Sequence, residues 1–283
     1  MLAQEKVNIR VDIMHETLNT TIYPLNNAET IILLHGGHGV SNKMEQVAKM
    51  LNEKCQVIYF EQRGTENSYC PHYSYTMEDC IPDINAITEY YKLDAFHLFG
   101  HSWSGLYAQI YTDGNAPKNI SLFLWSPSSG TNKSWEEMEN EVMAYNKIMA
   151  SIGEWFKMGW ISLLGVLGSN NAYRRLFRQV FKNYHKYLQD SESPEEELAE
   201  IFADPINKYR KEIIDYRSLK KVQNSPFPIS ISYVDHDIYG RSKIKLIERF
   251  STTRVYEIKG CGYISWLYKE GYVKKDISEC CEI

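Results

Sequence analysis

The chain has 283 residues, of which 43% are hydrophobic and 24% charged, and its net charge at pH 7 is -5. This length allows one large domain, or a core domain that carries a smaller inserted one. The composition is that of an ordinary globular protein. Because no basic stripe is present to neutralise phosphates, we expect no nucleic-acid partner.

Charged residues interrupt the first 14 residues, so we expect no signal peptide. The most apolar stretch, residues 158–167, is too short to span a bilayer, so we expect no membrane partner either. The six cysteines form no CxxC pair and show no zinc-ligand spacing. We therefore expect no metal site, and reduced thiols in a cytoplasmic protein.

Short apolar runs alternate with helix-like segments in the first part of the chain. The runs are residues 30–34, 56–60, 95–99 and 121–125, and helical periodicity separates them at 43–52 and 77–91. A continuous apolar run is typical of a strand that is buried on both faces. The alternation predicts βαβ units and a parallel sheet.

The pattern changes after residue 129. Only helix-like stretches are found up to residue 224, and strand character returns at 228–234 and 253–258. We therefore expect an α/β core made of residues 1–129 and 225–283, interrupted by a helical block at 130–224.

The strongest local motif is FGHSWSG at residues 99–105, between a predicted strand and a helix-like segment. A nucleophile elbow is a strained strand-to-helix turn that lifts a serine hydroxyl above the sheet. It needs small residues two positions before and after the serine, where Gly100 and Ser104 stand. We predict Ser102 to be a nucleophile.

A glycine-rich turn, HGGHG at residues 35–39, directly follows the first apolar run. Such a turn leaves backbone N–H groups to point at a developing oxyanion. We expect the N–H groups of Gly37 and Trp103 to form a two-donor oxyanion hole. A phosphate-binding loop is disfavoured, because neither GxGxxG nor GxxxxGK is present. His35 and His38 are interpreted as shaping this loop.

A third motif, EQRGTENS at residues 61–68, follows the second apolar run. The ordered set HGGHG, EQRGTENS and GHSWSG resembles the α/β-hydrolase superfamily, and most of all its proline iminopeptidase-like branch. That branch has HGGPG, DQRGxGxS and GGSWG in this order. The departures in this chain are His38, Glu61, Glu66 and Ser104.

The resemblance implies an α/β-hydrolase fold, a mostly parallel sheet flanked by helices, with residues 130–224 inserted as a helical cap after the sixth strand. It also implies a serine hydrolase that works by acyl transfer through an ester of Ser102, as an aminopeptidase, amidase or esterase. The substrate would be a small molecule or a short peptide. No cofactor is implied.

The resemblance further implies a triad in the order Ser, Asp, His. The acid should follow the run 228–234, where the family spacing selects Asp237 and leaves Asp235 as the alternative. The base should follow the last strand, in a G-H dipeptide. Tyr263 stands at that position, and no histidine follows His236.

A phenol titrates near pH 10, so Tyr263 is a poor base at neutral pH and we expect this chain to be nearly inactive. Three explanations remain open. The first is an engineered or selected His-to-Tyr change in a working hydrolase, and the second is a natural pseudo-hydrolase that binds without turnover. The third is a site rebuilt around another base, with His236, His101 or His38 as candidates.

The helical block also suggests where substrate binds. Residues 155–167 are apolar and aromatic, so we expect them to roof a mainly hydrophobic pocket. Proline iminopeptidase-like enzymes use cap acids to hold the free amine of the substrate, and the candidates here are Glu197, Glu200 and Asp204. A solvated helix face explains these three acids equally well.

Overall fold

The computed structural model describes residues 6–13, 16–37, 39–40, 44–69, 75–115, 119–186, 201–265, 271, 274–275 and 277. The strands are β1 Val7–Ile13, β2 Glu16–Tyr23, β3 Thr30–Leu34, β4 Gln56–Phe60, β5 Phe96–His101, β6 Asn119–Trp125, β7 Ile229–His236 and β8 Thr253–Gly262. The α-helices are α1 Glu45–Leu51, α2 Cys80–Tyr90, α3 Trp103–Asn115, α4 Lys133–Met149, α5 Ile152–Val166, α6 Asn170–His185, α7 Ala203–Asp215 and α8 Ser242–Arg249. Two short 3-10 helices are η1 Glu66–Ser68 and η2 Met77–Asp79.

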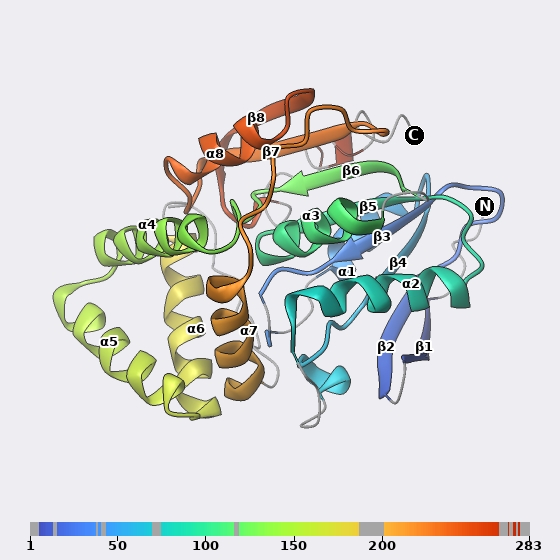
Figure 1. Ribbon diagram of the computed structural model, residues 1–283. Helices are drawn as coiled ribbons and strands as arrows, with labels where there is room; N and C mark the ends of the chain where they lie inside the picture. Colours follow the sequence, from blue (N-terminus) through green and yellow to red (C-terminus); the bar gives the residue numbers. More distant parts are fainter. Residues whose placement is uncertain are drawn as a thin grey trace.

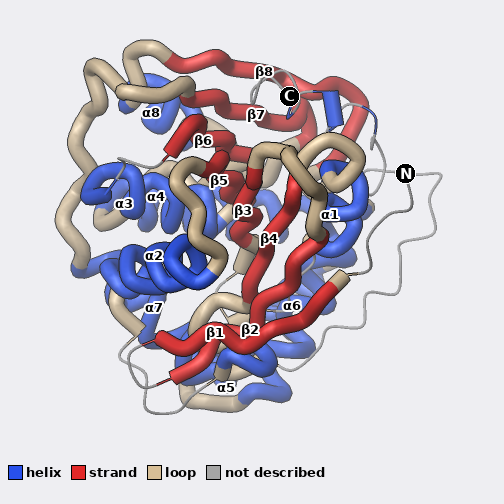
Figure 2. The backbone as a smooth tube through the Cα atoms, turned by 90° about the vertical axis from the view of Figure 1, so that its right-hand side faces the viewer, coloured by secondary structure: helices blue, strands red, loops and turns tan. Residues whose placement is uncertain are grey.

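The strands form one eight-stranded sheet in the order β1-β2-β4-β3-β5-β6-β7-β8. All pairs from β4 to β8 are parallel, whereas β1 and β2 pair antiparallel with each other and β2 pairs antiparallel with β4. Figure 2 shows α2 and α3 on one face of the sheet and α1 on the other. The predicted parallel sheet flanked by helices is confirmed.

The apolar runs form the central strands of the sheet. They are apolar throughout because helices cover both faces of the sheet there. Every residue of β3 and of β5 is buried. The rings of Phe99 in β5 and Phe123 in β6 stack with their centroids 5.5 Å apart. This rigid centre fixes the strand ends at which the predicted motifs lie.

Helices α4 to α7 come between β6 and β7 in the chain. Figure 1 places them together beyond the carboxyl ends of the strands. The assignment of residues 130–224 to a separate cap stays a prediction. Within the described part of the chain, every helix is too short or too polar to cross a bilayer.

Candidate active site

Ser102 lies in the turn between β5 and α3, with φ of +55°, in the left-handed region. Its N–H donates to the carbonyl of Trp125 in β6 at 3.0 Å, and its carbonyl accepts from the N–H groups of Gly105 and Ser128, both at 2.9 Å. A left-handed conformation costs a serine free energy, so it persists only where neighbouring groups hold it. Here the adjacent strand and the start of α3 supply those contacts.

Two glycines let the chain turn this tightly. A Cβ atom on Gly100 would lie 2.5 Å from the carbonyl oxygen of Ser104. A Cβ atom on Gly105 would lie 2.3 Å from the Cβ of Pro127. Both distances are shorter than any van der Waals contact, so the turn as it stands excludes side chains at these positions.

A hydrogen-bond network joins the three sequence motifs. The side-chain amide of Gln62 donates to the carbonyl of His35 at 2.9 Å and to the hydroxyl of Ser104 at 2.7 Å. Its oxygen accepts from the indole N–H of Trp103 at 3.2 Å. The Ser104 hydroxyl in turn donates to the His35 carbonyl. Ser104, a departure from the family glycine, is thus a buried link that sequence reasoning did not foresee.

The glycine loop lies directly against the turn. A Cβ atom on Gly36 would come within 3.1 Å of the Ser102 Cβ, and Gly37, with φ of +79°, lines the same cavity as Ser102. Trp103 is the first residue of α3, so its N–H lies at the positive end of the helix dipole. The two predicted oxyanion donors therefore come from segments that meet at Ser102.

Burial lowers the pKa of His35 to about 4, so the ring is neutral at pH 7. Its Nε2 accepts from the N–H of Gln62 at 3.1 Å, which ties the glycine loop to the segment after β4. His38 lies outside the described residues. The position of His35 agrees with a role in shaping the loop.

Ser102 lines a cavity of about 270 Å³. Its outer wall consists of apolar side chains from α4 and α6, namely Trp135, Met138, Val142, Phe177, Val180 and Phe181. The hydrophobic pocket was expected, but the expectation that residues 155–167 roof it was wrong. Those residues belong mostly to α5, which packs on α6 and contributes no side chain to this cavity.

The predicted amine-binding acids do not gather at the cavity. Asp204 lies in the first turn of α7, half-exposed, with its carboxylate 2.9 Å from the ammonium of Lys208, and it does not line the cavity. Glu197 and Glu200 lie outside the described residues. Among the described residues, the acid that lines the cavity is Glu139 of α4, which accepts two 2.7 Å hydrogen bonds from the Arg210 guanidinium.

Glu139 could have been found by helical spacing. It lies four residues after Trp135 and three before Val142, so all three share one helix face. What the sequence could not show was that this face, and not the apolar face of α5, is turned toward Ser102.

Hydroxyl groups surround the Ser102 side chain. The phenol oxygen of Tyr239 lies 3.3 Å from the Ser102 Oγ, 3.3 Å from the Ser128 Oγ and 3.3 Å from the phenol oxygen of Tyr263. Burial raises the pKa of Tyr263 well above its ordinary value, and the neighbouring Tyr239 and Tyr184 add to the rise. Burial also raises the pKa of Tyr239. Both phenols are therefore protonated at neutral pH.

The two candidate acids have different surroundings. Asp237 is held beside the hydroxyl cluster, since its carboxylate accepts from the Ser126 hydroxyl at 2.7 Å and from the N–H of Tyr239 at 3.2 Å. Burial raises its pKa to about 6. Asp235 instead accepts from the backbone N–H groups of Gly260 and Cys261 in β8, at 2.8 and 3.3 Å. Of the two, Asp237 is the one placed near Tyr239 and Ser102.

Two of the three histidines considered as alternative bases, His101 and His236, lie in the described residues, and neither is well suited to the role. The ring of His101 lines the cavity 5.1 Å from the Tyr263 ring, but burial, with the nearby His35, lowers its pKa to about 3. His236 is partly exposed, 3.8 Å from the Asp235 carboxylate, and does not line the cavity.

Comparison with known proteins agrees with this architecture. The sequence profile of the alpha/beta hydrolase fold matches residues 29–145. The proline iminopeptidase of Lactobacillus delbrueckii subsp. lactis is 31% identical over 121 residues, a match that spans 41% of this chain and 41% of the length of that relative.

Solved structures resemble the whole chain. VinJ superposes with a TM-score of 0.70 at 12% identity, and the proline iminopeptidase of Mycobacterium smegmatis with 0.67 at 14% identity, each alignment covering 98% of both chains. At such identities the likeness establishes the architecture alone. Together with the sheet order and the matched profile, it shows that this chain has the α/β-hydrolase fold.

Proposed function

We propose that this chain is a serine hydrolase of the acyl-transfer type, similar to proline iminopeptidases, with Ser102 as its nucleophile. The observation that carries the proposal is the left-handed turn at the carboxyl end of β5, which presents the Ser102 hydroxyl to an apolar cavity beside the glycine loop. A serine held in this way is typical of a nucleophile elbow. The similarity to proline iminopeptidases supports the same reaction class.

In the proposed reaction the Ser102 oxygen bonds to the carbonyl carbon of an ester or amide. The carbonyl oxygen becomes an oxyanion, which the N–H groups of Gly37 and Trp103 stabilise. The leaving group departs with a proton, and water then hydrolyses the ester on Ser102. Each half-reaction requires a group that takes the proton of the nucleophile and returns it to the leaving group.

Among the residues that the structure describes, none beside Ser102 is suited to that role. Tyr263 stands at the base position with its pKa raised by burial, so the phenol holds its proton at pH 7 and does not accept the one from Ser102. Loss of a triad base lowers turnover by up to about a million-fold in a well-studied serine protease. We infer that turnover here is nearly absent.

The substrate class follows from the cavity walls. Apolar side chains of α4 and α6 suit an apolar acyl group. The carboxylate that lines the cavity, Glu139, is neutralised by Arg210, so it attracts a free amine weakly. We therefore favour an ester or amide of an apolar acid over a peptide with a free N-terminus.

A second candidate function is ligand binding without chemistry. The observation that favours it is the hydroxyl cluster, in which Ser102 pairs with Tyr239 rather than with an imidazole. In that case the same cavity holds an apolar ligand and Ser102 stays unmodified.

The substitution Tyr263→His separates the two. We expect Ser102 in the unaltered chain to label slowly or not at all with a fluorophosphonate probe at neutral pH, and the Tyr263→His variant to label at least about a hundredfold faster, because imidazole acts as a general base there. Ser102→Ala in that background should abolish labelling. Tyr256→His, the same substitution within β8, is the matched control and should leave the rate unchanged.

Rapid labelling of the unaltered chain would show that another group has become the base. If neither chain labels but both bind an apolar fluorescent ligand, the protein binds a ligand without catalysing a reaction. With Tyr263→His, p-nitrophenyl hexanoate should be hydrolysed faster than prolyl p-nitroanilide. The reverse order would support the aminopeptidase assignment.

A further inference from the structure

The Ser102 hydroxyl belongs to a connected group of four hydroxyls on the cavity wall, the others being those of Ser128, Tyr239 and Tyr263. We call these four side chains the hydroxyl cluster. The phenol oxygen of Tyr239 lies at its centre, 3.3 Å from the oxygen of each of the other three. Among the residues that the structure describes, no carboxylate and no imidazole contacts any of the four oxygens. The cluster is therefore a group of donors that lacks a strong acceptor.

The contacts within the hydroxyl cluster are long. Hydrogen bonds from a hydroxyl to an oxygen usually measure about 2.5–3.0 Å, so contacts of 3.3 Å stabilise the cluster little. The Asp237 carboxylate does not relieve this, because it accepts instead from the Ser126 hydroxyl and from two backbone N–H groups. Burial raises the pKa of both Tyr239 and Tyr263, so both phenols keep their protons at neutral pH and can donate them to a ligand. The cluster thus suits a ligand group that accepts hydrogen bonds and brings no donor of its own.

The backbone around the cluster favours a negative charge. Ser102 directly precedes α3, a helix of 13 residues whose first N–H groups carry a partial positive charge. The glycine loop lies against the same turn at Gly36. Anions bind at helix N-termini because the backbone N–H groups and the helix dipole both attract them. Of the acceptor groups that bring no donor, a carboxylate therefore fits beside the cluster better than a neutral carbonyl.

The remaining walls of the cavity are apolar, and Met138 of α4 and Phe181 of α6 are two of their side chains. The charge of Glu139, the acid on this wall among the described residues, is offset by the Arg210 guanidinium. An apolar cavity of about 150 Å³ accommodates benzene, so the 270 Å³ here suits a hydrocarbon chain of about eight carbons. The cavity thus joins a site for an anion to a site for an apolar chain.

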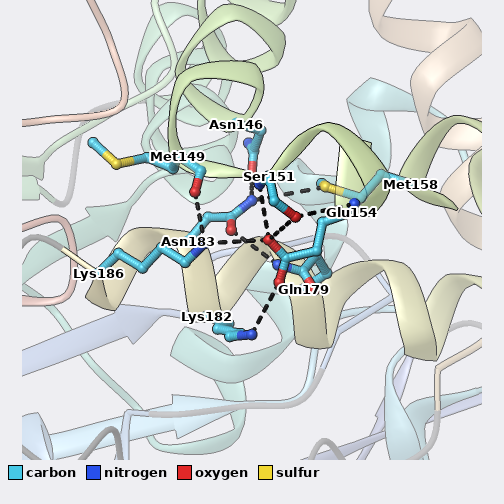
Figure 3. Close-up of polar contacts among 9 residues, drawn as sticks. All are labelled: Asn146, Met149, Ser151, Glu154, Met158, Gln179, Lys182, Asn183 and Lys186. Carbon is cyan, nitrogen blue, oxygen red and sulfur yellow. Dashed lines mark hydrogen bonds and ion pairs between the residues drawn. The ribbon is translucent and has the colours of Figure 1, made fainter. Parts of the chain in front are cut away.

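Hydrogen bonds between α4 and α6 hold these apolar walls in place (Figure 3). The buried side-chain amide of Asn183 in α6 donates to the side-chain oxygen of Asn146 in α4 at 2.9 Å. At the ends of the same helices, the Lys186 ammonium donates to the Met149 carbonyl at 2.6 Å and pairs with Glu154 of α5 at 3.3 Å. These contacts make the apolar walls rigid, and a rigid pocket lowers the cost of binding.

We propose that this cavity binds an apolar carboxylic acid in its anionic form, with the carboxylate at the hydroxyl cluster and the hydrocarbon chain against α4 and α6. A carboxylate accepts several hydrogen bonds at once, and those bonds are shorter and stronger than bonds between neutral groups. An alcohol brings a donor to a site of donors, and an ammonium accepts no hydrogen bond and is repelled by the positive end of α3. The inference rests on the proposed function, since it takes the Ser102 cavity as the substrate site and such an acid is the product of the proposed hydrolysis. Binding itself requires no turnover, so a chain with Tyr263 in place of a base holds the acid without reacting.

Isothermal titration calorimetry at pH 7 tests the proposal with three ligands of one chain length, namely octanoate, octan-1-ol and octylammonium. We expect the full chain to bind octanoate at least about tenfold more tightly than either of the others, because the anion alone accepts from the hydroxyl cluster at the positive end of α3. Octan-1-ol or octylammonium binding as tightly as octanoate overturns the proposal. So does the absence of measurable octanoate binding.

Two conservative variants test where the carboxylate lies. Tyr239→Phe and Tyr263→Phe each remove one hydroxyl and keep the ring, so each should weaken octanoate binding about tenfold. Tyr256→Phe, the same change within β8 and outside the cavity lining, is the matched control and should bind octanoate as the unaltered chain does. Unchanged octanoate affinity in both cavity variants overturns the proposal. Circular dichroism melts establish that each variant is folded, and the comparison of three ligands on the unaltered chain decides the proposal where a variant does not fold.

Failure of this proposal is distinguishable from failure of the proposed function. If octanoate binds as expected but the Tyr263→His variant does not label with the fluorophosphonate probe, the carboxylate site stands and Ser102 is not the nucleophile. If the Tyr263→His variant labels but the unaltered chain does not bind octanoate, the hydrolase stands and the carboxylate site is wrong.

Discussion

Ser104 and Glu66 both stand where the proline iminopeptidase-like motifs have glycine, and the structure shows a different result of each change. Ser104 contributes a hydroxyl that joins Gln62 to the carbonyl of His35. Glu66 instead takes a backbone conformation with φ of +41°, in the left-handed region, at a position that the family pattern gives to glycine. The first departure adds a buried hydrogen bond, whereas the second leaves a strained residue.

The strain at Glu66 predicts an unusual order of stability. Glu66→Gly and Glu66→Ala both remove the side chain, but only glycine adopts this φ without steric cost. We expect the Glu66→Gly variant to have a free energy of unfolding about 1 kcal/mol larger than that of Glu66→Ala. Urea unfolding curves measure the difference. Equal midpoints and equal slopes for the two variants would contradict a left-handed conformation at this position.

Asp237 predicts a pH dependence. Burial raises its pKa to about 6, above the ordinary value of 3.8, although the Ser126 hydroxyl opposes the rise. The folded chain therefore holds the proton of Asp237 more tightly than the unfolded chain does. Its contribution to stability is fully present below about pH 4 and is lost as the pH rises through about 6.

Asp237→Asn keeps the site neutral at all these pH values. The free energy of unfolding of the unaltered chain, relative to this variant, should fall between pH 4 and pH 7 by up to about 3 kcal/mol. The exposed Asp94→Asn serves as control and should show no such fall. Urea denaturation at a series of pH values provides both curves, and parallel curves for Asp237→Asn and the unaltered chain would show that folding does not raise the pKa of this carboxyl.

The site residues that could be predicted from the sequence are those that come directly after a strand. Ser102, Gly37 and Asp237 each come directly after an apolar run, and parallel strands end at the same edge of a sheet, so the order of motifs was enough to bring them together. Tyr239 and Glu139 lie on a loop and on a helix. Whether such a side chain reaches the cavity depends on how distant elements pack, which the local sequence does not record.

Among the elements, the central strands were predictable because both of their faces are buried, so each reads as a continuous apolar run. β1 and β2 were not foreseen. β1 alternates apolar and polar residues, a period of two from which a strand could have been predicted. In β2 the buried Thr20 and Thr21 interrupt any apolar run. β1 is the edge strand, where partial exposure weakens the pattern, and β2 lies next to it.

The placement of α5 was predicted wrongly for a different reason. Apolar residues occur on both of its sides, so the sequence does not indicate which side is packed and which is exposed. Residues 155–167 were expected to cover the pocket, but none of them lines it, and Phe156 and Trp160 face solvent. The helices that do line the cavity, α4 and α6, have clearer amphipathic patterns.

At the scale of the whole molecule, α4 is tied to the segment between β7 and β8 at the start of α8. The Glu141 carboxylate accepts hydrogen bonds from the N–H of Gly240 at 2.8 Å, and from the N–H and hydroxyl of Ser242 at 3.1 and 2.6 Å. Burial alone would raise the pKa of Glu141, but these hydrogen bonds hold it below its ordinary value. A second acid of α4, Glu137, also reaches α8, where it pairs with the exposed Lys245.

These two acids make a matched pair for the last prediction. Glu141→Gln leaves backbone N–H groups at the start of α8 without a charged acceptor, so we expect the free energy of unfolding to fall by about 1–3 kcal/mol at neutral pH. Glu137→Gln removes an exposed ion pair and should cost less than about 0.5 kcal/mol. Because the pKa of Glu141 is lowered in the folded chain, its contribution is present above the unfolded value and lost as the pH falls, so the two variants should converge in acid. Urea denaturation at neutral and acidic pH measures both effects, and an equal cost for the two variants at neutral pH would show that Glu141 contributes no more than a surface charge.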